Sequence, residues 1–506
     1  MRTSPLLTQI DADMADMAQL PLRLDPDSVP DTHSVELSLS EVQTSRIRIF
    51  NDGNTSIIGP TTATSPDSPV STWTAALSDS DLPQQDLTFL VEGVATGEVL
   101  ITLTYKTDAG TVIDSDTVKM TILDPGLIPN YDRDSNIDSD DRLMTKVNEP
   151  YYFWINDDDD ESAYEGEDRP GAGRADWRRA VPFVGNYVVD SVRDFADFFP
   201  VRVDVQGVLD VCPASQYNYV LSHPAGAFNA FINPGLASSE ADKHINHKTF
   251  CEDNEDAELV HISADGYVLP DTFLDEIVNS GKDLILVEGR SATDESMVLE
   301  IRKKSDDTVV CAVDMHVSIG GVEQMYRHIK LGSPGGRDTE TGVPSNYPDT
   351  LCSSKNAFFI HGFRVSGDGA RAWHAEMFKR LYWAGSKAKF WGVTWDADQK
   401  KSLINPLDPY YQGNVAVALD VADDFAASVS GISGAKVVLA HSLGNMVVSS
   451  AIADHDLNVQ DYFMLNAAVA VECYRPASHD TGVDGNYMVH PDWEDYQSGT
   501  WAAEYA

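Results

Sequence analysis

Short apolar runs with strand periodicity fill the part of the chain between residues 33 and 124. The segments HSVELSLS, SRIRIFN, LTFLVEG, GEVLITLTYKT and DTVKMTIL alternate apolar with polar residues or are rich in β-branched residues, and turn-forming residues separate them. A period of two places the apolar side chains on one face of a strand. Short strands at this spacing are typical of a β-sandwich. We therefore predict such a domain over residues 33–124.

A second β-rich pattern covers residues 185–333. Its candidate strands are FPVRVDV, YNYVLSH, AELVHIS, KDLILVEG, SMVLEIRK and TVVCAVDMHVSI, and LPDTFLDEIVNSG has the pattern of one short helix. We predict a second sandwich-type domain here. Residues 334–350, which are rich in Gly, Pro, Ser and Thr, have the composition of a linker.

The pattern changes after this linker to strands and helices in alternation. Strands are expected in NAFFIHGF, KAKFWGVTW, AKVVLAHS and DYFMLNAA, and helices in ARAWHAEMFKRLYWAG, NVAVALDVADDFAASVSG and LGNMVVSSAIADH. In the first helix, Trp373, Met377 and Leu381 form one apolar stripe. Strands joined by helices form a parallel sheet that is covered on both faces. We predict a doubly wound α/β domain over residues 351–506.

A serine lies on the tight turn between the third of these strands and the helix that follows it. The run AHSLG, residues 440–444, resembles the nucleophile elbow of the α/β-hydrolase superfamily, in its lipase and esterase branch, with Ala440 in place of the usual first glycine. The resemblance implies that Ser442 is a nucleophile. It also implies that the backbone N–H of Leu443 is one donor to the oxyanion.

An earlier strand carries a second landmark of the same family. It ends in His361-Gly362-Phe363, and the resemblance implies that the backbone N–H of Phe363 is the other oxyanion donor. The two landmarks occur in the family's order, and the resemblance covers roughly residues 351–470. We expect His361 and His441 to shape their turns rather than to act as bases.

The acid and the base of a catalytic triad have no clear place in this sequence. The family order is serine, then Asp or Glu, then His, but we find no further buried strand after Ala468. One interpretation is that the sequence is a fragment and the two residues lie beyond it. The alternative uses Glu472 or Asp484 as the acid and His479 or His490 as the base. A third interpretation is a domain without catalytic activity.

An acidic connector over residues 125–184 joins the first two domains. Its segment NYDRDSNIDSDD is similar to a dockerin-like or EF-type calcium loop, although Ser135 replaces the usual glycine. Calcium prefers six to eight oxygen ligands. The loop would supply them from Asn130, Asp132, Asp134, the carbonyl of Asn136, Asp138 and Asp141. A second acid cluster, Asp157 to Asp160, is a further calcium candidate, and a plain acidic linker is the alternative for both.

Composition restricts the partners of the chain. Asp and Glu number 80 against 36 Lys and Arg, so the net charge is −44. Such a charge repels nucleic acids and anionic membrane surfaces. No apolar run reaches the ~18 residues that a membrane helix needs, and we predict no integral membrane segment.

Within the first predicted domain, the residues from about 91 to 123 resemble the last strands of a bacterial immunoglobulin-like module.

These patterns predict a multidomain serine hydrolase that acts on a small-molecule or lipid carboxylic ester, with no organic cofactor and with Ca²⁺ as the candidate ion. The same machinery would also cleave amides. The alternative is a surface or binding protein whose sandwich and calcium modules carry the function. We expect an extracellular or cell-surface bacterial protein, although no signal peptide is visible; a cytoplasmic location is the alternative.

Overall fold

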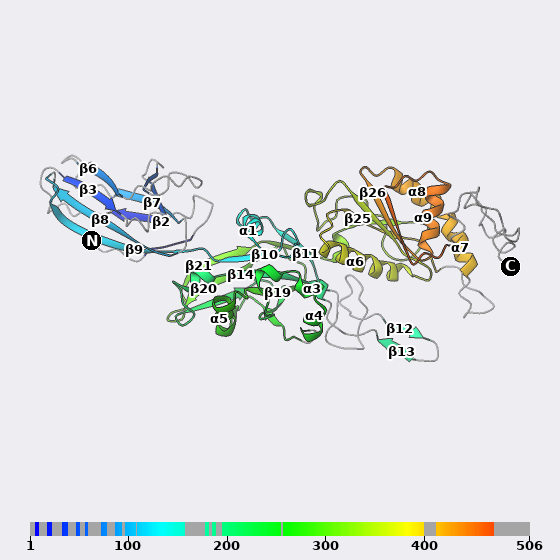
Figure 1. Cartoon of the computed structure of the whole chain (residues 1–506), viewed down its shortest axis with the longest axis horizontal. Coiled ribbons are helices and arrows are strands. Elements are labelled where there is room, and N and C mark those ends of the chain that lie inside the picture. The colour runs from blue at the N-terminus through cyan, green and yellow to red at the C-terminus, as the bar shows by residue number, and fades with distance from the viewer. Residues whose placement is uncertain are drawn as a thin grey trace.

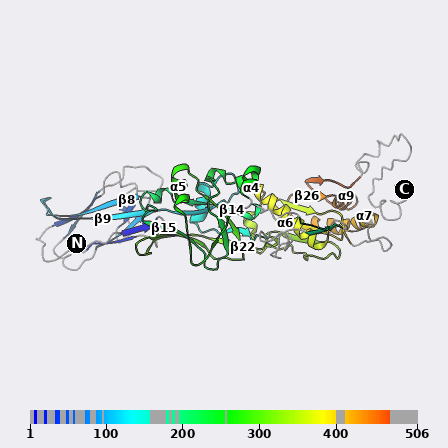
Figure 2. The same ribbon diagram turned by 90° about the horizontal axis from the view of Figure 1, so that it is seen from below.

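The described parts of the chain follow one another along a single long axis, from the N-terminal strands to the C-terminal sheet (Figures 1 and 2). The computed structural model describes residues 6–9, 18–22, 33–38, 47–50, 56–58, 72–77, 87–93, 97–107, 109–156, 178–181, 185–188, 195–254, 257–398 and 411–469.

The N-terminal region consists of two mainly antiparallel sheets. One has the order β1-β9-β8-β3-β6 and the other β2-β7-β4-β5. Their strands are β1 (Leu6–Gln9), β2 (Ala18–Leu22), β3 (His33–Ser38), β4 (Ile47–Phe50), β5 (Ser56–Ile58), β6 (Thr72–Leu77), β7 (Leu87–Gly93), β8 (Gly97–Thr107) and β9 (Val112–Leu123). In β8, Val99 and Ile101 are buried whereas Leu100 between them is exposed, as a period of two requires. Mainly antiparallel sheets thus lie where a sandwich was predicted, and β1 and β2 begin before residue 33.

The middle region contains two antiparallel sheets, of orders β10-β14-β19-β16-β17 and β18-β15-β20-β21. Their strands are β10 (Gly126–Pro129), β14 (Phe198–Asp204), β15 (Tyr217–Ser222), β16 (Phe228–Phe231), β17 (Val260–Ile262), β18 (Tyr267–Val268), β19 (Leu284–Gly289), β20 (Met297–Lys303) and β21 (Val309–Met315). Apolar residues of both sheets belong to one core. β11 (Tyr151–Trp154) pairs in parallel with β22 (Val317–Gly320), and β12 (Arg178–Val181) pairs with β13 (Gly185–Val188).

Short helices complete the middle region. They are α1 (Ser139–Lys146), α2 (Gln206–Leu209), α3 (Lys243–Asn246), α4 (Lys248–Asn254) and α5 (Asp271–Ser280), with the 3-10 helices η4 (Phe195–Asp197), η5 (Ser238–Glu240), η6 (Val322–Gln324) and η7 (Asp349–Leu351). The predicted helix in LPDTFLDEIVNSG is α5. It follows Pro270 and ends at Gly281, whose φ of 66° suits a left-handed helix cap.

The C-terminal region contains a sheet of five parallel strands, of order β23-β25-β24-β26-β27. Its strands are β23 (Arg327–Lys330), β24 (Asn356–Ile360), β25 (Lys389–Thr394), β26 (Lys436–His441) and β27 (Asp461–Leu465), and its helices are α6 (Gly367–Trp383), α7 (Tyr411–Asp420), α8 (Ala422–Ser430) and α9 (Gly444–Ala453). The first strand, β23, precedes the segment predicted as a linker.

Two different cores cover the two faces of this parallel sheet. Phe358 and Ile360 of β24 face a core formed with α7, α8 and α9. Their neighbours Ala357 and Phe359 face the opposite side, where α6 packs. That second core is continuous with the core of the middle region, because Phe153 of β11 also belongs to it.

The fold class predicted from the sequence, two sandwiches followed by an incomplete, doubly wound α/β-hydrolase domain, is wrong. Most strand pairs of the described residues are antiparallel, and helices are few. The parallel sheet is not a separate body, because the face under α6 shares its core with antiparallel sheets. Strand and helix alternation predicts parallel pairing locally, but it contains no information about what covers the second face.

A buried ion pair joins α6 to the middle region. The Lys379 Nζ atom lies 2.7 Å from an oxygen of Asp197 in η4, and the two side chains are 1% and 0% exposed. The Trp154 indole N–H also donates to Asp197, and the Trp383 indole N–H donates to the Ala196 carbonyl at 2.7 Å. Because each buried charge has an opposite charge and further partners, this contact fixes the position of α6.

We predict that Lys379→Met lowers the free energy of unfolding by about 3–5 kcal/mol, because the substitution leaves the Asp197 carboxylate buried without its cation. Urea unfolding followed by tryptophan fluorescence measures the change. Lys248→Met is the matched control, since Lys248 is 85% exposed in its pair with Glu252 and should cost at most about 1 kcal/mol. Equal effects of the two substitutions would contradict this account of α6.

Candidate active site

The site is built on the turn that joins β26 to α9. β26 ends at His441, α9 begins at Gly444, and Ser442 between them has a φ of 50°. A residue with a side chain adopts this left-handed region at a cost of roughly 1–2 kcal/mol. Backbone hydrogen bonds hold it there: the Ser442 N–H donates to the Leu465 carbonyl at 2.9 Å, and the Ala468 N–H donates to the Ser442 carbonyl at 3.1 Å.

Two glycines allow the end of β24 to approach this turn closely. A Cβ atom on Gly362 would lie 2.7 Å from the Ser442 Cβ and 3.0 Å from the His441 carbonyl oxygen. A Cβ atom on Gly444 would lie 2.6 Å from the backbone oxygen of His361. Contacts this short are not found for real Cβ atoms, and the backbone atoms nearby could move away only at a cost in free energy. A side chain at either glycine would therefore push the two segments apart. The segment around residues 361–363 and the serine turn are therefore in contact.

The serine hydroxyl and the two backbone N–H groups predicted to act at this turn are not used in hydrogen bonds within the described structure. Within the described residues, no hydrogen bond is formed by the Ser442 hydroxyl or by the backbone N–H groups of Phe363 and Leu443. Ser442 is partly exposed, whereas the Leu443 side chain is fully buried. Acyl transfer requires a hydroxyl and N–H donors that are not already bonded within the protein, and these groups meet that condition among the described residues. The roles themselves stay predictions.

The two histidines of the turns lie in different environments. The His361 ring accepts a hydrogen bond from the Trp395 backbone N–H at 3.2 Å and lies 3.1 Å from the Gly362 carbonyl. Burial lowers the pKa of His361 to about 4, so the ring is neutral at pH 7, as its hydrogen bond from the Trp395 N–H requires. The His441 ring stacks on Trp373 with the centroids 4.9 Å apart. Burial lowers the pKa of His441 as well.

The predicted acid and base candidates are outside the described residues. These are Glu472, Asp484, His479 and His490. The structure therefore brings Ser442, Phe363 and Leu443 into one region but does not place a triad. The acid cluster Asp157 to Asp160 also lies outside the described residues.

Asp396 is an acid that the sequence analysis missed. It lies two residues after the end of β25 and borders a cavity of about 260 Å³ beside the N-terminus of α6. One carboxylate oxygen accepts from the Ser333 N–H at 3.3 Å, while the other is buried without a hydrogen-bond partner among the described residues. Its signal in the sequence was an acidic residue directly after the apolar strand KFWGVTW.

The acidic side chains of the predicted calcium loop accept hydrogen bonds from backbone N–H groups of the same loop and of α1. Asp134 and Asp132 accept hydrogen bonds from the N–H groups two residues further on, at 2.6 and 3.2 Å. Asp138 caps α1 by accepting from the Asp140 N–H at 2.9 Å. Asp141 accepts from the N–H groups of Tyr131 and Asp138, at 2.7 and 3.0 Å. No group of three or more potential metal-binding side chains is found in the described part of the chain.

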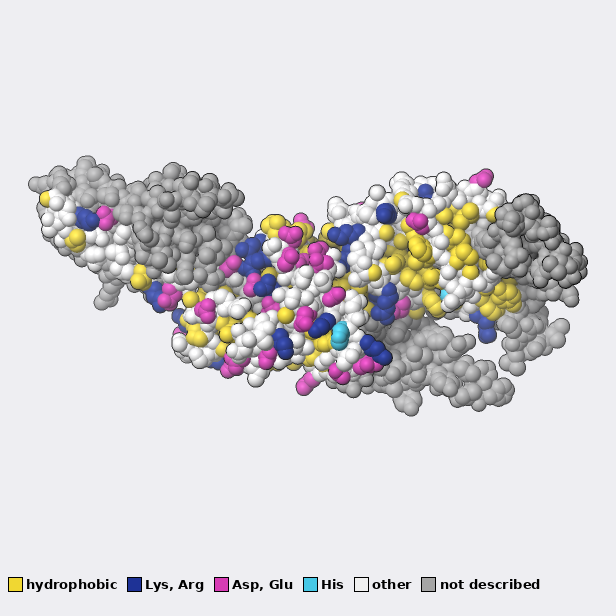
Figure 3. All heavy atoms as spheres, viewed as in Figure 1, with side chains coloured by type: hydrophobic (Ala, Val, Ile, Leu, Met, Phe, Trp, Pro, Cys, Tyr) yellow, Lys and Arg dark blue, Asp and Glu magenta, His cyan; other side chains and the backbone are white. Residues whose placement is uncertain are grey.

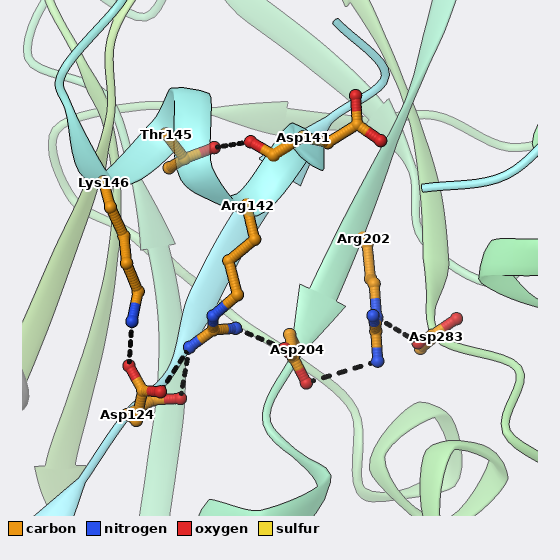
Figure 4. Close-up of polar contacts among 8 residues, drawn as sticks. All are labelled: Asp124, Asp141, Arg142, Thr145, Lys146, Arg202, Asp204 and Asp283. Atoms are coloured by element: carbon orange, nitrogen blue, oxygen red, sulfur yellow. Dashed lines mark hydrogen bonds and ion pairs between the residues drawn. The ribbon is translucent and has the colours of Figure 1, made fainter. Parts of the chain in front are cut away.

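The basic side chains of α1 form ion pairs with acids that are not part of the predicted calcium loop (Figure 4). Arg142 contacts Asp124 and Asp204, and Lys146 lies 3.5 Å from Asp124. In Figure 4 the Asp141 carboxylate points away from these basic side chains. Burial, together with the nearby Asp132, raises the pKa of Asp141 to about 6. Calcium binding by this loop stays a prediction from the sequence, because the described acidic side chains accept backbone hydrogen bonds and do not form a metal-binding group.

Comparisons with known proteins were made on the whole chain. No family model and no curated protein matches the sequence. Among solved structures, a cohesin module from the family 33 glycoside hydrolase of Clostridium perfringens is similar at 11% identity, with 23% of this chain and 90% of that chain covered and a TM-score of 0.15. The fimbrial subunit MyfA from Yersinia enterocolitica has 17% identity, coverage of 24% and 92%, and a TM-score of 0.14. The D00-D0 domain of intimin has 8% identity, coverage of 61% and 95%, and a TM-score of 0.20.

These neighbours correct the assignment made from the sequence. They are β-sandwich domains, and none of these neighbours is an α/β-hydrolase. The prediction that the chain belongs to the α/β-hydrolase superfamily is therefore wrong, while the sandwich character and the multidomain organisation are supported. A strand, a small-residue turn and a helix form an elbow-like feature locally, so the motif does not define a superfamily. Within the described residues, no helix has both the length and the apolar character needed to cross a membrane.

We predict that calcium raises the melting temperature at pH 7.5, because a cation would relieve the repulsion between Asp132 and Asp141. The raised pKa of Asp141 means that the folded state binds a proton between about pH 4 and 6 that the unfolded state releases. Calcium and this proton compete, so the calcium effect should shrink at pH 5.

Scanning calorimetry with and without calcium tests this site. Asp132→Ala and Asp138→Ala should remove most of the calcium-dependent rise, whereas Asp140→Ala, one position outside the proposed ligand set, should keep it. A rise that both ligand variants retain in full would exclude the loop as the calcium site.

Proposed function

We propose that the chain hydrolyses carboxylic esters with Ser442 as the nucleophile. The observation that carries this proposal is the left-handed backbone of Ser442 at the β26–α9 turn. Backbone strain of this kind persists only where the surroundings hold it, and it is concentrated at functional sites. Here the strain lifts a serine hydroxyl out of the strand, next to a glycine-lined contact with the end of β24.

The proposed reaction is acyl transfer through a covalent intermediate. Ser442 Oγ would form a bond to the ester carbonyl carbon while a general base takes the hydroxyl proton. The N–H groups of Phe363 and Leu443 would hold the oxyanion, and one such donor contributes roughly 10²- to 10³-fold in rate. The alcohol would then leave with the proton, and water would hydrolyse the acyl-enzyme. The acid and the base of the proton relay would lie beyond this sequence, or, as the alternative, would be Glu472 or Asp484 as acid with His479 or His490 as base.

An apolar acyl group suits the surface around the turn. Trp391 and Trp395 are core residues, at 4% and 0% exposure, but Trp373 beside His441 is 43% exposed. On the edge strand β27, Phe463 and Met464 are also exposed. Figure 3 shows hydrophobic side chains gathered on this C-terminal part of the molecule. Amides would be cleaved by the same groups, so the ester preference rests on this apolar setting.

A second candidate function is binding at a cell surface. The observation that favours it is the share of the chain devoted to antiparallel sandwich sheets, which present loops without forming a reactive site. The similar structures are sandwich domains and not α/β-hydrolase domains. Their TM-scores are too low to support a function for this chain. In this case the turn at Ser442 would be an inactive scaffold, and the protein would act outside a bacterial cell or on its surface; a cytoplasmic location is the alternative.

We predict that a fluorophosphonate probe labels the wild-type chain and not Ser442→Ala. Ser430→Ala is the matched control, because Ser430 is exposed on α8 in the same region, and it should be labelled like the wild type. Intact-mass spectrometry measures the adduct. A wild-type chain that takes no label would favour the binding candidate.

Ser442→Gly separates catalysis from folding. Glycine adopts a positive φ without strain, so this variant should lose all labelling and yet unfold with a free energy about 1 kcal/mol higher than the wild type. Urea unfolding gives that value. If Ser442→Gly were less stable than Ser442→Ala, the strained geometry would be incorrect.

A further inference from the structure

A cavity of about 220 Å³ lies between the predicted calcium loop, β11 and the C-terminal half of α6. It is separate from the Ser442 turn. Five tyrosines contribute to its wall, together with Arg133, and Asp132, Glu149 and Lys387 stand at its exposed rim. No residue of this cavity other than those of the loop was singled out by the sequence analysis.

Arg133 is a buried cation with few partners. The side chain is 7% exposed, its guanidinium lies 4.2 Å above the Tyr382 ring, and one of its nitrogens donates to the Tyr382 carbonyl at 3.2 Å. No ion pair of Arg133 exists within the described ranges. A guanidinium has five N–H donors, and a buried charge without an opposite charge is costly. The Arg133 guanidinium therefore has N–H donors that an anionic ligand can use.

A buried tyrosine lines the same cavity. Tyr151 is 2% exposed, and its hydroxyl makes no hydrogen bond of regular geometry among the described residues. The Tyr382 hydroxyl lies nearby but donates to the Tyr152 carbonyl at 3.3 Å. Burial raises the pKa of Tyr151 and of Tyr347, and the positive charge of Arg133 opposes that rise in both. Arg133, Tyr151 and Tyr347 line the same cavity, so one ligand can contact all three.

We propose that this cavity binds a small aromatic carboxylate. The carboxylate would accept hydrogen bonds from the Arg133 guanidinium and the Tyr151 hydroxyl, which gives the guanidinium an opposite charge and satisfies the buried donor. The ligand ring would pack among the tyrosine rings, where edge-to-face contacts are favourable. A phosphate dianion fits less well, because the carboxylates of Asp132 and Glu149 at the rim would repel its second charge.

Isothermal titration of the full chain with benzoate and with benzamide tests the proposal. The two probes share shape and differ in charge, so benzoate should bind at least about tenfold more tightly. Tyr151→Phe removes a single oxygen and should weaken benzoate binding about tenfold or more, and Arg133→Met should abolish it. Arg290→Met, at an exposed arginine outside the cavity, should bind benzoate like the wild type.

Several results would overturn the proposal. These are no benzoate binding at millimolar concentration, equal affinity for benzamide, or unchanged affinity in Tyr151→Phe. Should Arg133→Met fail to fold, as judged by its melting curve, the nearly isosteric Tyr151→Phe decides alone. The Ser442 proposal is unaffected by any of these outcomes, because the two sites share no residue.

Discussion

The close approach of two backbone segments is the constraint on which the candidate active site depends. Gly362 at the end of β24 and Gly444 at the start of α9 leave no space for a Cβ atom between them and the neighbouring backbone. Ser442 lies in this contact with a positive φ. Together these features hold the backbone of the serine turn against the end of β24.

Helix α6 connects this site to the rest of the molecule. Near its beginning Trp373 stacks on His441, and near its end Tyr382 supports the guanidinium of Arg133. Between them Lys379 forms the buried pair with Asp197. One helix therefore positions the serine turn, the tyrosine-lined cavity and the shared core, which is why the parallel sheet is not an independent unit.

The sequence predicted local structure better than it predicted tertiary arrangement. The strand, turn and helix around Ser442 follow from periodicity and small residues, and α5 from its Pro and Gly boundaries. The apolar stripe of α6 lies only at the edge of its buried face: Met377 and Leu381 pack partly against the core and Trp373 is 43% exposed, whereas Phe378 and Tyr382 are buried. Periodicity could not reveal the buried face, because it includes Lys379, whose burial depends on an aspartate 182 residues away.

The most direct measurement of the central claim is a crystal structure of the chain after treatment with a fluorophosphonate. The account predicts a phosphonyl group on Ser442 Oγ whose free oxygen accepts hydrogen bonds from the N–H groups of Phe363 and Leu443. A Ser442 without adduct, or an adduct whose oxygen faces away from both N–H groups, would contradict it.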